Sequence, residues 1–467
     1  MLFNTLQFLI FFIIVLGLYR ALSDYRWQNA MLLVASYVFY GAWNWRFLFL
    51  IAASTLIDYW AAQKIHRATQ PRMRKLLLGI SLSANLGLLG FFKYYNFGIE
   101  SFQILLSTIG FDVHSHSLNI LLPVGISFYT FQTISYTVDV YRRVRPPVTN
   151  LLNFALYVAY FPQLVAGPIE KATQLLPQIE APRTVTQQDV RIAFLWILLG
   201  YFKKVAIADT LAPMIDYAFS NPQEVSGAVS LVAILAFAIQ IYGDFAGYTL
   251  IARGVSRLMG IHLMENFRAP YLAASPRDFW YRWHISLSTW LREYLYFPLG
   301  GSRHGRFRTY LNLMITMLLG GLWHGARWNF VLWGFYHGLL LVGNHALNQI
   351  PFRFNNRAWK GAQIALMFGF TLFGWLLFRV HDMGQLAIIL ENITTRFYWT
   401  PDLIYYLKPT LCAFVLLMAY HIWQERTGND LILLQTSKWV QLGSYAFIIF
   451  ALVTIRFQAV PFVYFQF

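Results

Sequence analysis

A histidine and an arginine, His324 and Arg327, stand between two long apolar stretches of the sequence. Thr309 to Trp323 carries no charged residue, and Trp328 to Ile350 carries none except histidine. As an α-helix the first stretch would be roughly 22 Å long, whereas the hydrocarbon layer of a bilayer is about 30 Å thick. We therefore expect this corner to lie within the depth of the membrane. An ionisable side chain there is costly unless it faces protein or water, which makes His324 a candidate functional residue.

The chemistry that suits such a histidine is general base catalysis. An imidazole with a pKa near neutrality can take a proton from a hydroxyl group. If the acyl donor is an activated thioester, the site need only bring donor and hydroxyl together. Glycines at positions 320, 321 and 325 would allow a backbone or a substrate to come close to His324. The alternative is a histidine that only hydrogen-bonds a neighbouring helix.

A second histidine lies in the region 266–301, which mixes arginines with many aromatic residues. This composition, without a full apolar span, favours helices lying at the cytoplasmic interface. His284, Ser288 and Arg292 recur at intervals of four, so in a helix they would share one face. That face would bind an anionic head group or approach His324, and interfacial anchoring is the alternative. The region's arginines are Arg268, Arg277, Arg282 and Arg292.

Two further segments depart from plain apolar spans. Residues 161–169 contain two prolines and a glycine among apolar residues, so we expect a buried or re-entrant bend instead of a regular helix. Residues 240–248 place Asp244 between two glycines in an aromatic setting. The alternative for Asp244 is a carboxylate at a helix end, paired with a nearby arginine.

The elements that must position these residues follow from the composition. Of the 467 residues, 58% are hydrophobic and 12% are charged, about half the charged fraction of soluble domains. The sequence thus predicts an all-α, polytopic membrane protein with a single domain, 1–467, and about 10–12 membrane-embedded helices. The expected spans are 3–19, 28–42, 46–62, 76–92, 118–140, 190–212, 227–249, 309–323, 328–348, 361–380, 408–424 and 439–457.

The charge pattern orients these spans. The net charge of +16 is concentrated in short connecting segments, such as 64–75 and 303–308, and positive loops stay cytoplasmic. The basic residues flank apolar spans instead of forming one stripe, which argues against nucleic-acid binding. The opening segment has no basic stretch before it and no cleavage site after it, so we expect a retained first span. Cys412, the only cysteine, lies in an apolar run and predicts a buried thiol.

Several kinds of chemistry have no support in the sequence. It contains no Gly-x-Ser-x-Gly elbow, Walker A loop or His-Glu-x-x-His motif, which argues against a serine hydrolase, an ATP-driven pump and a zinc protease. His114 and His116 are close together, but the histidines otherwise lack the spacing of metal ligands. We expect no bound metal or cofactor.

Motifs shared with a known family cover most of the chain. They lie at residues 91–97, 122–132, 161–169, 240–248, 266–271, 278–292, 319–328 and 464–467. On these stretches the sequence resembles the membrane-bound O-acyltransferase family, and within it the bacterial alginate O-acetyltransferase type. The resemblance implies helices ringing a central funnel, with His324 of Gly-Leu-Trp-His-Gly as the essential histidine and His284 as its polar companion. Tyr281 occupies a place where the family commonly has arginine.

The resemblance also implies a reaction. A thioester donor, acetyl-CoA or an acyl-carrier protein, would enter from the cytoplasm, drawn partly by the arginines of region 266–301. His324 would act as base on a hydroxyl from the opposite side, and His284 would position the thioester or assist proton transfer. Residues expected to line the funnel or bind substrate are Arg327, Asp244, Trp323, Ser288, Arg292, Arg282 and Gln132, with residues 127–136 and 161–169 as walls.

The expected partners lie on both sides of a bacterial inner membrane. The acceptor would be an alginate-like polysaccharide, reached directly or through a periplasmic acyltransferase of the serine-hydrolase type. Within the same class, D-alanyl transfer to teichoic acid and O-acetylation of peptidoglycan or cellulose are alternatives. The alternative from another class is a transporter or flippase in which His324, Asp244 and Arg327 line a polar path.

Overall fold

The computed structural model describes residues 1–111, 117–165, 167–349, 356–428, 430–455 and 462–463. Within these ranges the chain is helical, and its one β-type pairing is an isolated antiparallel bridge between Phe267 and Trp283. The expected all-α class is therefore confirmed. His114 and His116 lie outside the described residues. The chain divides into two compact units, Met1–Val190 with Val255–Met264, and Arg191–Gly254 with Glu265–Phe467.

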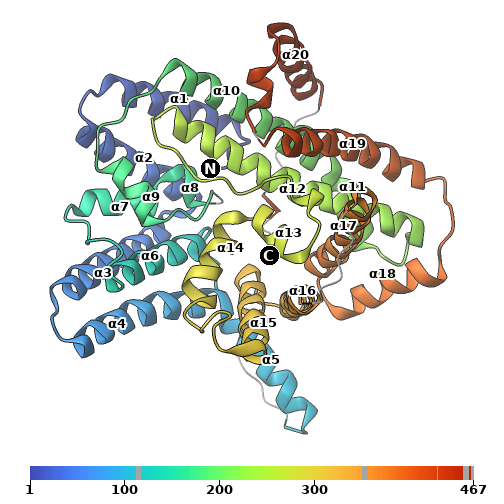
Figure 1. The fold of residues 1–467 in the computed structure, drawn as a ribbon, viewed down its shortest axis with the longest axis horizontal. Coiled ribbons are helices and arrows are strands. Elements are labelled where there is room, and N and C mark those ends of the chain that lie inside the picture. The colour runs from blue at the N-terminus through green and yellow to red at the C-terminus, as the bar shows by residue number, and fades with distance from the viewer. Residues whose placement is uncertain (112–116, 166, 350–355, 429, 456–461, 464–467) are drawn as a thin grey trace. The chain divides into compact units, whose positions relative to one another are not determined.

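The first unit is built from the N-terminal helices (Figure 1). A π-helical turn, Gly90–Tyr94, joins two of them, α4 and α5, into one long rod. The helices are α1 (Leu6–Ala21), α2 (Tyr25–Asn44), α3 (Leu48–Arg67), α4 (Pro71–Leu89), α5 (Tyr95–Thr108), α6 (Ile126–Tyr141), α7 (Leu151–Ala159), α8 (Phe161–Leu164) and α9 (Ala172–Ile179).

The second unit carries both candidate histidines. A π-helical segment, Phe202–Asp209, links α10 to α11, and short helices connect the long ones around residues 270–296. Its helices are α10 (Gln187–Tyr201, which begins in the first unit), α11 (Thr210–Ser220), α12 (Gly227–Arg257), α13 (Pro276–Arg282), α14 (Ile285–Leu291), α15 (Gly305–His324), α16 (Trp328–Leu347), α17 (Arg357–Arg379), α18 (Met383–Thr395), α19 (Leu403–Thr427) and α20 (Lys438–Thr454).

Among the described helices, four are long and apolar enough to cross a membrane by themselves. They are the α4–α5 rod, α12, α17 and α19. The helix α12 is 83% buried over its most apolar stretch, whereas the other three are 22–39% buried and leave most of their apolar surface outward. Apolar surface of this kind is stable only against lipid or a partner. The protein is thus a multi-pass membrane protein.

The helix boundaries correct several expectations. The helix before His324 starts at Gly305, not at Thr309, so its 20 residues extend about 30 Å and are long enough to span the hydrocarbon layer. The argument from a short span was therefore wrong, because the basic residues at its start are part of the helix. The helix α12 continues eight residues past position 249. The expected span 118–140 becomes helical only at Ile126.

Several helices, among them α5, α7 and α18, were not predicted, because their apolar runs are short or interrupted by polar residues. The bend at 161–169 is confirmed: α8 ends after four residues, and all described residues of this stretch are buried. Cys412 is exposed, contrary to the expectation of a buried thiol. An apolar run on a lipid-facing helix such as α19 does not require burial within the protein.

A polar cluster holds α3, α4 and α6 together in the first unit. The carboxylate of Asp58 is fully buried and accepts hydrogen bonds from Ser81 and from the amide of Asn85, at 2.8 and 3.0 Å. Asn85 in turn accepts from the hydroxyls of Ser54 and Thr133. Because a buried carboxylate is stable only when its oxygens are hydrogen-bonded, this cluster fixes the mutual register of the three helices.

The α15–α16 hairpin depends on two glycines. A Cβ atom at Gly321 would lie 2.2 Å from the carbonyl oxygen of Phe330, and one at Gly334 would lie 2.4 Å from that of Met317. No other residue allows the two backbones to approach so closely. The hairpin fixes where α15 ends, and its last residue is His324.

Candidate active site

His324 lies in an aromatic cage at the end of α15. Its side chain is buried, and its ring meets Trp323, Trp333 and Phe378 edge-on, with centroid distances of 5.1, 5.0 and 5.2 Å. These rings come from α15, α16 and α17, so three helices position one imidazole. Rings at this distance fix the orientation of the imidazole, and their carbon edges compete little with a substrate for hydrogen bonds to it.

His284 is buried and held in a strained backbone conformation. Its φ is +42°, in the left-handed region, and its relative exposure is 0%. Non-glycine residues adopt this conformation at a cost of about 1–2 kcal/mol, so the surrounding structure must impose it. The helix α14 begins only at Ile285. The expectation that His284, Ser288 and Arg292 share a helix face is therefore wrong for His284.

An extended segment at residues 266–268 imposes this conformation. The backbone oxygen of Asn266 accepts the N–H of Ile285 at 3.0 Å, and its side-chain Oδ1 accepts the N–H of Ser286 at 3.1 Å. The N–H of Arg268 donates to the carbonyl of Arg282 at 2.9 Å. The segment thus pairs with the chain on both sides of His284 and interrupts the helix there. Asn266 lies in a motif recognised in the sequence, but its role in this turn was not predicted.

The electrostatics of His284 follow from its burial. Its Nδ1 lies 3.5 Å from the hydroxyl of Ser286, and its Nε2 has no hydrogen-bond partner among the described residues. Burial lowers the pKa of the His284 imidazole to about 3, so the ring is neutral at pH 7. A neutral ring with an open nitrogen can form a hydrogen bond to a substrate.

Trp323 joins the two histidines into one cluster. Its ring centroid lies 5.1 Å from that of His324 and 6.0 Å from that of His284. On the other side of His324, Trp333 contacts His337, with centroids 4.6 Å apart. His337 is also buried, and its Nδ1 has no partner within the described part of the chain. It was missed from the sequence because a lone histidine in an apolar helix has no spacing signal.

The arginines of region 266–301, which were expected to attract the donor, mostly contact other residues of the second unit. Arg282 pairs with Asp278 at 2.7 Å and with Glu425 at 2.6 Å, which connects α13 to α19. Arg292 lies over the ring of Tyr281 at 5.5 Å. The hydroxyl of Ser288 donates to the carbonyl of Trp283 and helps to hold the His284 turn.

Three other expected site residues lie elsewhere. Asp244, expected to line the funnel, is fully buried in the middle of α12 and pairs with Lys204 at 2.7 Å. The alternative of a helix-end carboxylate paired with an arginine is therefore wrong. The other oxygen of Asp244 accepts the N–H of Val463 at 2.6 Å. Arg327 is exposed, and its guanidinium lies 3.1 Å from His381. Gln132 belongs to the first unit, where its amide donates to the carbonyl of Tyr157.

Both histidines lie within a segment that matches a known family. The model of the membrane-bound O-acyltransferase family matches residues 141–381, which is more than half of the chain. The chain belongs to this family. It is therefore an O-acyltransferase, and the residues that resemble the family's motifs include those that form the histidine cluster.

Individual relatives cover most of the chain. A probable alginate O-acetylase from Pseudomonas putida is 45% identical over 83% of this chain and 79% of its own length. A peptidoglycan O-acetyltransferase from Helicobacter pylori is 34% identical over 84% of this chain and 80% of its own. A teichoic acid D-alanyltransferase from Streptococcus thermophilus is 27% identical over 54% of this chain and 64% of its own. The O-acyltransferases in this group act on different polymers, as their names state.

Proposed function

We propose that this membrane-bound O-acyltransferase transfers an acetyl group from a cytoplasmic thioester to a hydroxyl of an alginate-like polysaccharide outside the inner membrane. The donor is acetyl-CoA or an acetylated carrier protein. The observation that carries the proposal is the buried pair of histidines on either side of Trp323. The 45% identity to a probable alginate O-acetylase supports acetyl and an alginate-like acceptor over the D-alanyl and peptidoglycan alternatives, whose relatives are less similar.

His324 acts as the general base in this mechanism. As the acceptor hydroxyl attacks the thioester carbonyl, the imidazole takes the hydroxyl proton and a new C–O bond forms. The C–S bond then breaks, and the thiolate leaves with the proton returned from the imidazolium. No external oxidant or energy source is required, because a thioester is more reactive than the ester formed. The aromatic cage keeps water away from the thioester and so favours transfer over hydrolysis.

His284 positions the thioester or assists the proton transfer. Its open Nε2 offers a hydrogen bond, and its neutral state at pH 7 adds no positive charge that would hold His324 in an unfavourable protonation state. The turn braced by Asn266 fixes this nitrogen in space, which is the condition for stabilising a transition state more than the ground state. The acetyl group reaches the polymer directly or through a periplasmic partner of the serine-hydrolase type.

Transfer from labelled acetyl-CoA to mannuronate oligosaccharides by the purified protein tests the proposal. His324→Ala should lower the rate by about 10²- to 10⁴-fold, the usual contribution of a general base. His345→Ala, which changes a half-buried histidine near the other end of α16, is the matched control and should keep the wild-type rate. A correctly folded His324→Ala protein with full activity would refute the assignment, as would acceptor movement without consumption of acetyl-CoA.

A further inference from the structure

Three helices of the first unit bring polar side chains together in one buried cluster. On each of α3, α4 and α6, two polar residues lie four positions apart, so they share one face of their helix. All of them are at most 2% exposed, in a part of the chain where most buried side chains are apolar. We call this set the Asp58 cluster: Ser54 and Asp58 of α3, Ser81 and Asn85 of α4, and Thr133 and Thr137 of α6.

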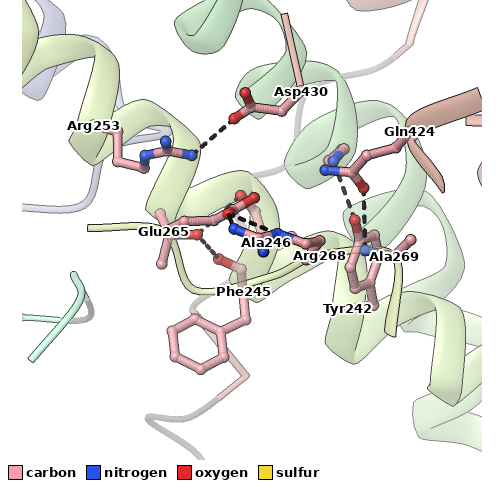
Figure 2. Close-up of polar contacts among 11 residues, drawn as sticks. Tyr242, Phe245, Ala246, Arg253, Glu265, Arg268, Ala269, Gln424 and Asp430 are labelled. Atoms are coloured by element: carbon pink, nitrogen blue, oxygen red, sulfur yellow. Dashed lines mark hydrogen bonds and ion pairs between the residues drawn. The ribbon is translucent and has the colours of Figure 1, made fainter. Parts of the chain in front are cut away.

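The negative charge in this cluster has no counter-charge among the described residues, since no lysine or arginine there pairs with the carboxylate of Asp58. In the second unit, by contrast, Figure 2 shows Asp430 paired with Arg253 and Glu265 paired with Arg268, at 3.1 and 2.8 Å. A fully buried carboxylate is costly unless its charge is neutralised. The cluster must therefore bind either a proton or a cation.

The hydroxyl oxygens of the cluster have spare capacity to bind a cation. In the contacts of Ser54, Ser81, Thr133 and Thr137 the hydroxyl is the donor, so each oxygen keeps its two lone pairs. The hydroxyl of Thr133 also lies 3.2 Å from the carbonyl oxygen of Thr130 in its own helix. When it donates its proton there, it presents only lone pairs to the cluster.

Distances between oxygen atoms in the cluster favour a cation over a proton. The Oγ1 atom of Thr137 lies 3.4 Å from Oδ1 of Asp58, and Oγ1 of Thr133 lies 3.3 Å from Oδ1 of Asn85. Both distances are long for hydroxyl hydrogen bonds, which are usually about 2.7–2.8 Å. A cation of the size of Na⁺ or Ca²⁺ binds oxygens at about 2.4 Å, and two oxygens at right angles to it then lie about 3.4 Å apart. The observed spacing is that of oxygens around a shared ion.

The ligand types in the cluster select a monovalent ion. One carboxylate among neutral oxygens balances a single positive charge, whereas protein sites for Ca²⁺ usually combine several carboxylates and those for Mg²⁺ retain water. Transition metals prefer the thiolate and imidazole groups that the cluster lacks. The expectation of no bound metal rested on the spacing of histidines, and histidines take no part in a site of this kind.

We infer that the Asp58 cluster binds a sodium ion between α3, α4 and α6. The ligands are the carboxylate of Asp58, the amide oxygen of Asn85 and the hydroxyls of Thr133 and Thr137. The two serines of the cluster hold the carboxylate and the amide in place by hydrogen bonds. The ion neutralises the buried charge and connects the three helices, so the stability of the protein depends on Na⁺. This site is separate from the proposed acyl transfer, because both candidate histidines belong to the second unit.

Binding of radiolabelled Na⁺ and thermal unfolding of the full-length protein in detergent test the inference. The wild type should bind the label saturably, and its melting temperature should rise by about 2–4 °C as NaCl replaces N-methyl-D-glucamine chloride at constant ionic strength. Asp58→Asn keeps the shape of the side chain without its charge, so it should bind no Na⁺ and unfold at the same temperature in both salts. Thr137→Val keeps the carboxylate and should weaken Na⁺ binding about 10-fold, through the loss of one neutral oxygen ligand.

Thr55→Val is the matched control, because Thr55 is a buried threonine of α3 whose hydroxyl donates to the carbonyl of Ile51 within the same helix. It should keep the wild-type affinity for Na⁺. A wild type that binds no label and melts at one temperature in both salts would show that Asp58 carries a proton, and the inference would be wrong. A response to Na⁺ that persists in Asp58→Asn would place the ion elsewhere and overturn it equally. If Asp58→Asn does not fold, equal Na⁺ affinities of Thr137→Val and Thr55→Val would overturn the inference.

Discussion

Gly321 is a position where a single methyl group should displace the candidate active site without touching its chemistry. In Gly321→Ala, the new Cβ would lie 2.2 Å from the carbonyl oxygen of Phe330 and 3.1 Å from the Cα atom of Gly334. Both neighbours are backbone atoms and cannot rotate away. The α15 and α16 helices must therefore separate by about 1 Å, as overpacked cores do. His324 lies on the same turn of α15 and moves with it.

The magnitude follows from this displacement. Overpacking of this kind costs about 1–3 kcal/mol, which a folded membrane protein tolerates with a lower melting temperature. A catalytic group misplaced by about 1 Å loses on the order of 10²-fold in rate. We expect kcat for acetyl transfer to fall by about that factor, with a much smaller change in KM for the donor, because the substitution displaces the proposed base and removes no group from the protein surface.

Initial rates of acetyl transfer at saturating acetyl-CoA measure this effect. Gly343→Ala is the matched control, since it lies on α16 and a Cβ there would meet no other atom within 4 Å. Alanine is the better helix former by about 1 kcal/mol, so this control should be at least as stable as the wild type and equally fast. A Gly321→Ala protein with the wild-type rate, or an equal loss in both variants, would refute the reasoning.

Three further predictions test the electrostatics. Burial lowers the pKa of His284 to about 3, below its value of about 6.5 in the unfolded chain, so the folded state loses stability as the pH falls from 6.5 toward 3. The melting temperature of His284→Gln should therefore fall less than that of the wild type between pH 7 and pH 5. Lys204→Met should lower the melting temperature more than Asp244→Asn, because it deprives two buried carboxylates, Asp209 and Asp244, of their lysine, and one unpaired buried charge costs about 3–5 kcal/mol. Arg327→Ala should change the rate of transfer by no more than about two-fold, because the side chain is exposed.

Much of the fold was predictable because a membrane imposes a simple rule on sequence. Long apolar runs bounded by charge must be helices when the surroundings offer no hydrogen bonds. The positions of α16, α17 and α20 follow from this rule to within a few residues. The start of α15 does not, because Arg306 and Arg308 belong to its first turn and hydropathy alone excludes them. Charged residues at the end of a span reach the interface without ending the helix.

Contacts between segments distant in the sequence determined the local backbone structures that the sequence pattern could not predict. Spacing of four between His284, Ser288 and Arg292 is a valid helix signal, but the hydrogen bonds that Asn266 accepts from Ile285 and Ser286 interrupt the helix at His284. Similarly, the glycines beside Asp244 suggested a helix end, whereas they permit close helix contact: a Cβ at Gly247 would lie 2.7 Å from the carbonyl oxygen of Gly200. In both cases a partner distant in sequence decides the local structure.

The sequence predicted best those residues of the candidate site whose type is unusual among their neighbours in the chain. A histidine next to glycines in an apolar run is rare enough to identify His324 and its neighbour Trp323. Asn266 and His337 have no unusual neighbours in the sequence. Only their burial, and side-chain nitrogen atoms that have no partner among the described residues, distinguish them. Arg327, by contrast, was selected for its charge, and the structure places that charge outside the cluster. A charged residue in an apolar sequence is a candidate for the functional site, and its burial in the structure shows whether it belongs to the cluster.

The proposed reaction requires that water be kept from the base, and the aromatic cage around His324 meets this requirement, which the histidines alone do not. A base that activates a sugar hydroxyl would activate water equally well, and water is far more abundant at any membrane interface. Trp323, Trp333 and Phe378 cover the edges of the His324 ring and leave little polar surface on which water could be held. A sugar brings its own binding contacts and can displace what little water enters. In the proposed mechanism, selectivity for transfer over hydrolysis therefore resides in the rings around His324. Substituting Trp333 by a smaller side chain should raise hydrolysis of acetyl-CoA relative to transfer, whereas His324→Ala should lower both.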